Sequence, residues 1–330
     1  MELRYAPRLP FPVSVLGYGM WGITDWTSDQ AENPERALDH AVESGCTFFD
    51  TALYYGAGRC EQVLGRLLRR HPGVPLRVAT KVPPRDGRFP ARAGSDLREV
   101  FPTEHILECA RTSIRNLGVE TIDLLQLHVW TDDWADRDEW RTAVERLKSE
   151  GSIRAFGISV NRWEPENVLL AVRTGLVDSV QVIYNIFDQA PEDHLFPACE
   201  AAGTAVVVRV PFDEGSLTGR LDRSTRFPDS DWRHGYFTPA NLAATMDRID
   251  ALRADLGPDA DLPRTALRFA ISHPAVTTVI PGMRRVGNVE RNVAAVAAGP
   301  LDPDTLRLLA HHRWDRRPGF LESVAPGGGK

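Results

Sequence analysis

Short apolar runs alternate along the chain with longer segments in which apolar residues recur at helical spacing. The runs are rich in β-branched and aromatic residues and end abruptly at polar ones, which is typical of strands buried within a sheet. They predict strands at 13–19, 46–49, 76–81, 122–128, 153–159, 179–185, 205–210 and 276–280. The segments with helical spacing predict helices at 33–45, 60–70, 103–117, 138–149, 165–173, 191–202, 239–256, 263–272, 285–298 and 303–312.

Strand and helix follow each other roughly eight times, and no linker interrupts the alternation. This order predicts a single parallel sheet covered by helices. Eight units over this length favour a closed (β/α)8 TIM barrel over residues 1–317, with a long loop at 213–238 after the seventh strand. We expect the Gly-rich end, 318–330, to be a flexible tail.

An open, doubly wound sheet is the alternative, because Gly17-Tyr18-Gly19-Met20-Trp21-Gly22 spells G-x-G-x-x-G. In a dinucleotide-binding unit a helix begins at this motif, and an acidic residue closes a second strand about 20 residues later. Neither follows here, so the motif supports the open sheet only weakly.

Charge and cysteine content exclude several classes of function. The net charge is −6 and the sequence contains no dense Lys/Arg block, which disfavours a nucleic-acid or anionic-membrane partner. No apolar stretch approaches the roughly 18 residues of a membrane span, and the N-terminus lacks the apolar region of a signal peptide. The four cysteines are scattered without a C-x-x-C pair, so we expect no metal, free thiols and a cytoplasmic protein.

Candidate chemistry begins where the second predicted strand ends, at Asp50, with Tyr55 in the following loop. Alone, Asp50 is as well explained by capping of backbone N–H groups at a strand end. In a barrel, however, the C-terminal strand ends meet at one face. Polar residues stand at these ends: Asp50, Lys81, His128, Ser159 with Asn161, Gln181 and Arg209. Taken singly, each would be a surface charge or a structural residue, but one shared pocket explains their common position better.

Several segments together carry a resemblance to a known family. They are Asp50-Thr51-Ala52-Leu53-Tyr54-Tyr55-Gly56 with Glu61-x-x-Leu64-Gly65, Ala79-Thr80-Lys81, Leu124-Leu125-Gln126-Leu127-His128, Gly151-Ser152-Ile153-Arg154-Ala155-Phe156-Gly157-Ile158-Ser159, Gln181-Val182-Ile183-Tyr184-Asn185 and Ile280-Pro281-Gly282. In this order they resemble the aldo-keto reductase superfamily over about residues 13–298.

The resemblance implies a (β/α)8 barrel that reduces carbonyl groups with NADPH and without metal. It implies a catalytic tetrad of Asp50, Tyr55, Lys81 and His128. A carbonyl that accepts hydride develops negative charge on oxygen and needs a proton donor, the expected role of Tyr55. We expect Lys81 to lower the Tyr55 pKa, Asp50 to keep Lys81 charged, and His128 to position the carbonyl oxygen.

The resemblance also implies a cofactor site across the strand ends. Around the nicotinamide it places Gly19, Met20, Trp21, Ser159, Asn161 and Gln181. Over the pyrophosphate it places Ser216, Leu217, Gly219 and Arg220. At the adenosine end it places Gly282, Met283, Arg284, Asn288 and Asn292. Arg284 is the natural partner of a 2′-phosphate, although a solvated helix start explains it nearly as well.

Three positions depart from the family pattern. The first is Arg209 in the segment Val208-Arg209-Val210-Pro211-Phe212, where many family members have an aromatic residue that stacks on nicotinamide. We include Arg209, Pro211 and Phe212 in the expected cofactor site. The planar guanidinium of Arg209 would stack on the ring or reach an acidic or phosphorylated substrate. The usual Ser-Asn pair is split as Ser159-Val160-Asn161, and Arg291 stands where an acidic residue is common, so we expect NADP(H) with NAD(H) as the alternative.

The leading hypothesis is therefore an NADPH-dependent reductase of aldehydes, ketones or ketosugars. We expect a substrate pocket lined by Trp21, Tyr55, His128 and Trp130. The alternative is a cofactor-binding, redox-sensing regulatory subunit with little turnover, against which the intact tetrad argues. Composition leaves open whether the protein is a monomer or a homo-oligomer.

Overall fold

The computed structural model describes residues 1–23 and 34–316, and its centre is one sheet of eight parallel strands. The strands are β3 (Tyr18–Gly19), β4 (Phe48–Asp50), β5 (Arg77–Val82), β6 (Ile122–Leu127), β7 (Ile153–Ser159), β8 (Ser179–Ile183), β9 (Ala205–Arg209) and β10 (Val276–Val279). They follow one another around the sheet in chain order. Parallel bridges from Leu16 to Val279 and from Gly19 to Gly282 join the first strand to the last. This closure confirms the predicted (β/α)8 fold.

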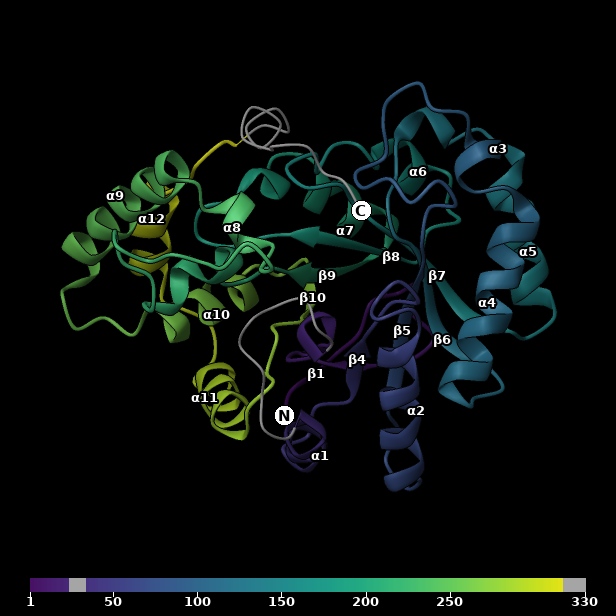
Figure 1. Cartoon of the computed structure of the whole chain (residues 1–330), viewed down its shortest axis with the longest axis horizontal. Coiled ribbons are helices and arrows are strands. Elements are labelled where there is room, and N and C mark those ends of the chain that lie inside the picture. The colour runs from purple at the N-terminus through teal and green to yellow at the C-terminus, as the bar shows by residue number, and fades with distance from the viewer. Residues whose placement is uncertain (24–33, 317–330) are drawn as a thin grey trace.

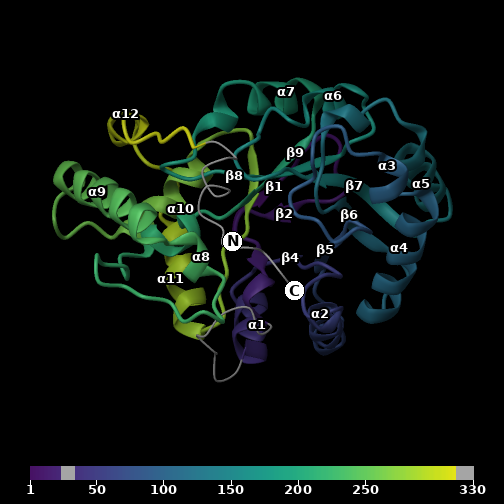
Figure 2. The same cartoon turned by 45° about the horizontal axis from the view of Figure 1, so that its top comes forward.

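Helices surround the strands (Figures 1 and 2). The α-helices are α1 (Pro34–Glu43), α2 (Arg59–Arg70), α3 (Leu97–Val100), α4 (Thr103–Leu117), α5 (Asp138–Ser149), α6 (Leu169–Arg173), α7 (Leu195–Ala202), α8 (Arg233–Tyr236), α9 (Pro239–Leu256), α10 (Leu262–Ser272), α11 (Val286–Ala297) and α12 (Pro303–Ala310). The 3-10 helices are η1 (Trp21–Ile23), η2 (Asp132–Trp134), η3 (Ala190–Glu192) and η4 (Asp213–Thr218). No helix of the described residues is both long and apolar enough to span a membrane.

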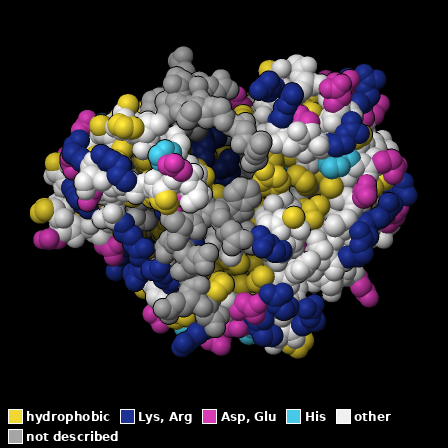
Figure 3. All heavy atoms as spheres, viewed as in Figure 1, with side chains coloured by type: hydrophobic (Ala, Val, Ile, Leu, Met, Phe, Trp, Pro, Cys, Tyr) yellow, Lys and Arg dark blue, Asp and Glu magenta, His cyan; other side chains and the backbone are white. Residues whose placement is uncertain are grey.

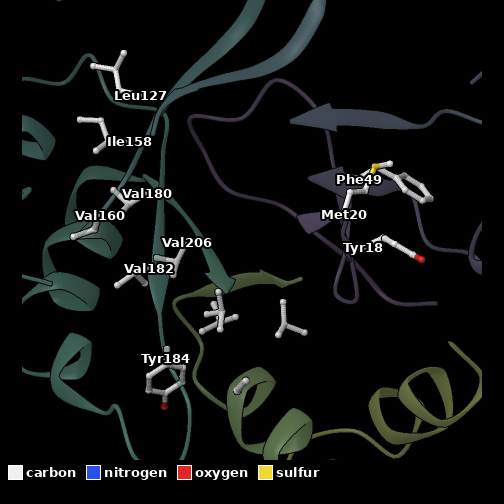
Figure 4. Close-up of a cluster of buried hydrophobic side chains, with 14 of the residues drawn as sticks. Tyr18, Met20, Phe49, Leu127, Ile158, Val160, Val180, Val182, Tyr184 and Val206 are labelled. Atoms are coloured by element: carbon white, nitrogen blue, oxygen red, sulfur yellow. The ribbon is translucent and has the colours of Figure 1, made fainter. Parts of the chain in front are cut away.

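The period of two along each strand divides the apolar residues into two cores. Outward positions such as Leu127, Ile158 and Val180 join the large core between strands and helices (Figure 4). Inward positions such as Leu124 and Ala155 form a smaller core inside the barrel. Because both strand faces are buried, the runs read as continuously apolar in the sequence.

The first predicted strand, 13–19, is divided in the structure. Its start is β2 (Val13–Ser14), which pairs antiparallel with β1 (Leu3–Arg4), and only its end is the barrel strand β3. Phe11 and Val13 are buried against the inward side chains, so this hairpin closes one end of the barrel. The start of the predicted strand therefore pairs with β1, which lies outside the barrel sheet.

Three other predicted boundaries differ from the structure. The predicted 213–238 loop contains η4 and α8, and the predicted 191–202 helix is divided into η3 and α7. The predicted 165–173 helix begins only at Leu169. The Asp132 carboxylate accepts hydrogen bonds from the N–H groups of Leu170 and Ala171, which caps the helix at that point from a distant loop. The predicted helix start at Asn33 and the 318–330 tail lie outside the described residues.

Candidate active site

The inward alternation that builds the inner core also places the polar strand-end residues in the barrel. Asp50 is two residues beyond the inward Phe48, and Lys81 is two residues beyond the inward Ala79. In the same way Gln126 follows Leu124 on β6, and Arg209 follows Val207 on β9. The apolar layer therefore gives way to a polar one at the same end of successive strands.

A buried ion pair between Lys81 and Asp50 is the centre of this polar layer. Lys81 Nζ donates to Asp50 Oδ1 at 2.5 Å and to the Thr51 carbonyl oxygen at 2.8 Å. The other carboxylate oxygen, Oδ2, accepts from Gln181 Nε2 at 2.8 Å and from Gln126 Nε2 at 3.2 Å. Both charges are thus paired and hydrogen-bonded, which is what removal from water requires.

Tyr55 and His128 lie next to this ion pair. Lys81 Nζ is 5.2 Å from the centre of the Tyr55 ring, and the Tyr55 and His128 ring centroids are 5.7 Å apart. The imidazole is also packed edge-on against Phe89, at a centroid distance of 5.0 Å. The His128 backbone N–H donates to the Val82 carbonyl oxygen, while its buried Nδ1 has no hydrogen-bond partner. The four tetrad residues are therefore brought together in one place.

Burial controls the protonation of these groups. It raises the pKa of Tyr55 above its ordinary value, and the negative charge of Asp50 adds to the rise. Burial lowers the pKa of Lys81, an effect that the attraction of Asp50 opposes. Burial, with the charges of Lys81 and Arg209, holds the pKa of His128 well below its usual range.

The lowering of the Tyr55 pKa that we expected from Lys81 is therefore outweighed, and the net shift of this pKa is upward. The ammonium is neutralised by Asp50, and the cation that opposes the rise is Arg209. Tyr55 is a neutral phenol at pH 7, able to donate a proton.

A cavity of about 800 Å³ opens beside Tyr55 and His128. Basic side chains are visible within it in Figure 3. Predicted residues that line it are Gly19, Trp21, Asp50, Tyr55, His128, Ser159, Asn161, Gln181, Arg209, Pro211, Phe212, Arg220, Gly282, Arg284 and Asn288. A side chain at Gly19 would meet the Ile280 carbonyl oxygen at 2.6 Å, so only glycine allows β3 to approach the segment after β10 this closely.

Other predicted residues do not line the cavity. They are Met20, Lys81, Ser216, Leu217, Gly219, Met283 and Asn292, together with Trp130. Lys81 is behind Tyr55 and Asp50, and Ser216 donates to Asp213 Oδ2 at 2.6 Å. We predicted that Trp130 contacts the substrate, but its ring is fully buried against Trp134 and Trp140 and does not reach the cavity.

Several lining residues were not predicted from the sequence. Arg162 pairs with Glu214 at 2.6 Å and so joins the loops after β7 and β9 across the cavity. Tyr54 and Phe89 form an aromatic rim of the cavity: their rings are in contact, and the residues are 41% and 40% exposed. These residues stand in loops without periodicity. The only available signal was the position of Arg162 directly after Asn161.

No group of three or more His, Cys, Asp or Glu side chains within 1–23 and 34–316 is placed to hold a metal ion. The four cysteines are buried free thiols.

Comparisons with known proteins agree with this geometry. Residues 15–313 match the model of the aldo/keto reductase family. The chain is 31% identical over 279 residues to the uncharacterized oxidoreductase YqkF of Bacillus subtilis, covering 83% of this chain and 86% of the relative. It is 26% identical over 306 residues to the NADH-specific methylglyoxal reductase of Escherichia coli, covering 88% of this chain and 92% of the relative.

Solved structures extend the agreement to the whole fold. The aldo-keto reductase AKR11C1 from Bacillus halodurans in its holo form matches with a TM-score of 0.76 and 29% identity, over 96% of this chain and 97% of that chain. The glycerol dehydrogenase AKR11B4 from Gluconobacter oxydans matches with a TM-score of 0.76 and 25% identity, over 99% and 97%. The chain therefore belongs to the aldo/keto reductase family of NAD(P)H-dependent oxidoreductases that act on carbonyl compounds.

Proposed function

We propose that the protein reduces an aldehyde, ketone or ketosugar to the alcohol with NADPH, and that Tyr55 donates the proton. One observation carries the proposal. The Tyr55 ring stands at the cavity wall between His128 and the buried Lys81–Asp50 pair, at 5.7 Å from the imidazole and 5.2 Å from the ammonium. A phenol in this position meets the oxygen of a carbonyl group bound in the cavity.

The roles of the four residues follow from their charges. Tyr55 is protonated at pH 7, as a phenol of ordinary pKa also is, and so has a proton to give to the oxygen that becomes negative. The Lys81 ammonium supports the phenolate left after proton transfer, and Asp50 orients Lys81. His128 stays neutral, so one imidazole nitrogen can donate a hydrogen bond to the same carbonyl oxygen.

The cavity also fits the nicotinamide cofactor that the family uses, which supplies the hydride when bound. The lining continues from Tyr55 to Arg284 and Asn288, and the space beside Gly282 is open, with no atom within 4 Å of where a Cβ would stand. Arg220 and Arg284 would hold phosphate groups, and Ser159 with Asn161 would face the nicotinamide. We propose NADP(H) over NAD(H) because of Arg284, whose guanidinium can bind a 2′-phosphate in bidentate fashion.

The test is NADPH oxidation at 340 nm with a panel of aldehydes, ketones and ketosugars. Tyr55→Phe removes the proton donor and should lower kcat by about 10²–10⁴-fold. Tyr5→Phe, the same chemical change at a side chain that is 75% exposed, is the matched control and should leave kcat unchanged.

Three results would overturn the assignment. Equal activity in Tyr55→Phe and wild type would remove Tyr55 from the reaction. Tight NADPH binding without turnover of any carbonyl would favour the regulatory-subunit alternative. Fluorescence titration that gives a lower Kd for NADH than for NADPH would contradict the cofactor preference.

A further inference from the structure

Arg209 is a half-buried cation that lines the cavity and has no carboxylate partner among the described residues. Its Nη2 donates to the Val160 carbonyl oxygen at 3.0 Å, and its buried Nε has no hydrogen-bond partner. Within residues 1–23 and 34–316, no carboxylate oxygen lies within 4 Å of this guanidinium, whereas nearby Arg162 is paired with Glu214. Buried polar groups in proteins are normally hydrogen-bonded or bound to a ligand, so a cavity-lining guanidinium with a buried, unbonded Nε requires an explanation.

The surroundings of Arg209 favour an added anion. Burial and the positive charge of Arg162 lower its pKa to about 10, and the carboxylates of Glu214 and Asp50 only partly compensate. Glu214 is shared with Arg162, and Asp50 is committed to Lys81. The Arg209–Arg162–Glu214 group therefore carries one uncompensated positive charge inside the cavity. An anion bound there would pair with Arg209 and relieve the repulsion between the two guanidinium groups.

The position of Arg209 points to the substrate as the source of this anion. Arg209 is at the inward end of β9 and interacts electrostatically with Tyr55, the proposed proton donor. It is therefore on the reacting side of the cavity. Arg220 and Arg284 are additional cations in the lining that phosphate groups of a cofactor can use.

We propose that Arg209 binds an anionic group of the substrate, a carboxylate or a phosphate, so that the protein prefers carbonyl compounds that carry a negative charge. This inference rests on the proposed carbonyl reduction and specifies its substrate class. The bond formed is a charge-assisted hydrogen bond, and Arg209 itself takes no part in proton or hydride transfer.

The test compares 4-formylbenzoate with 4-formylbenzamide, which have nearly the same shape but differ by one charge. With NADPH, wild type should favour the carboxylate about ten- to a hundredfold in kcat/KM, the range expected for a hydrogen bond between charged groups. Arg209→Met should bring this ratio close to one, mainly through KM of the carboxylate, and Arg209→Lys should retain part of it. Arg111→Met, on the exposed face of α4, is the control and should keep the wild-type ratio.

Binding of NADPH, followed by tryptophan fluorescence, separates the two sources of the anion. If Arg209→Met weakens NADPH binding tenfold and slows both aldehydes equally, the anion is a cofactor phosphate and the inference is overturned. A wild-type ratio near one, or a high ratio that persists in Arg209→Met, also overturns the inference but leaves carbonyl reduction intact. Absence of turnover with every carbonyl of the panel overturns the proposed function and the inference with it. Because the wild-type ratio requires no substitution, the test holds even where a variant does not fold.

Discussion

Replacement of Asp50 by Asn tests the electrostatic account of the site most directly, because the change keeps the shape and removes one buried charge. In wild type the Lys81 ammonium is fully buried and 2.5 Å from the Asp50 carboxylate. Loss of one partner from a buried ion pair typically costs about 3–5 kcal/mol, since the remaining charge stays out of water without compensation. We expect Asp50→Asn to lose about this much stability at pH 7.

The loss should depend on pH in a defined direction. Burial already lowers the pKa of Lys81, and only Asp50 opposes this strongly, so the variant should have a still lower Lys81 pKa. Between that value and the unfolded pKa of about 10.4, the unfolded chain binds one more proton than the folded chain. Stability in this window therefore rises with pH, by about 1.4 kcal/mol per pH unit for one proton.

The measurement is urea unfolding at pH 7, 8 and 9. Asp136→Asn, at a fully exposed carboxylate, is the control and should change neither stability nor slope by more than about 0.5 kcal/mol. Adding Lys81→Met to Asp50→Asn should recover stability at pH 7, because no buried charge of the pair remains. An Asp50→Asn variant within 1 kcal/mol of wild type, with no added rise in stability from pH 7 to 9, would refute this reasoning.

Three further predictions follow from single features of the structure. His128 should remain neutral above pH 6, so the pH profile of kcat/KM for carbonyl reduction should show no ionisation near pH 6.5. An ionisation near pH 6.5 that is also present in Tyr55→Phe would contradict a neutral His128. Arg316→Met removes the buried partner of Asp188 and Asp213 and should lower the free energy of unfolding in urea by about 3–5 kcal/mol. NADPH binding should also weaken, because Asp213 begins η4. Unchanged stability would show that the ion-pair network makes no net contribution to stability. Gly65→Ala should cost about 1–3 kcal/mol, because the new methyl group would stand 2.4 Å from a backbone carbonyl oxygen at the end of α4; a neutral result would mean that α2 shifts without cost.

Much of the fold was predictable because strand and helix periods are local. Both faces of the barrel strands are buried, so the runs that form β6 and β8 are mostly apolar rather than alternating and are readily recognised. The start of α6 was mispredicted because its cap, Asp132, comes from a loop 37 residues earlier. The first strand was mispredicted because β2 pairs with β1 outside the barrel, and the apolar pattern is the same for either partner.

Position along a strand was sufficient to predict which polar side chains lie together at the barrel end. Asp50 and Lys81 end strands on the inward side, and barrel closure brings such ends together. Position along a strand was not sufficient for Trp130, whose indole fits equally well in a cavity wall or an aromatic cluster, or for Arg162, which stands in a loop without periodicity.

The sequence by itself determined the alternation of strands and helices, the barrel, and the set of polar residues at the strand ends, since each depends on spacing within one segment. Only the tertiary structure decided how these residues share charge. The Lys81 ammonium pairs with the Asp50 carboxylate, Tyr55 keeps its proton, and Arg209 has no carboxylate partner among the described residues. Distances between side chains from different strands depend on register and closure, and at these distances burial outweighs the pairwise attraction that the residue types alone suggest.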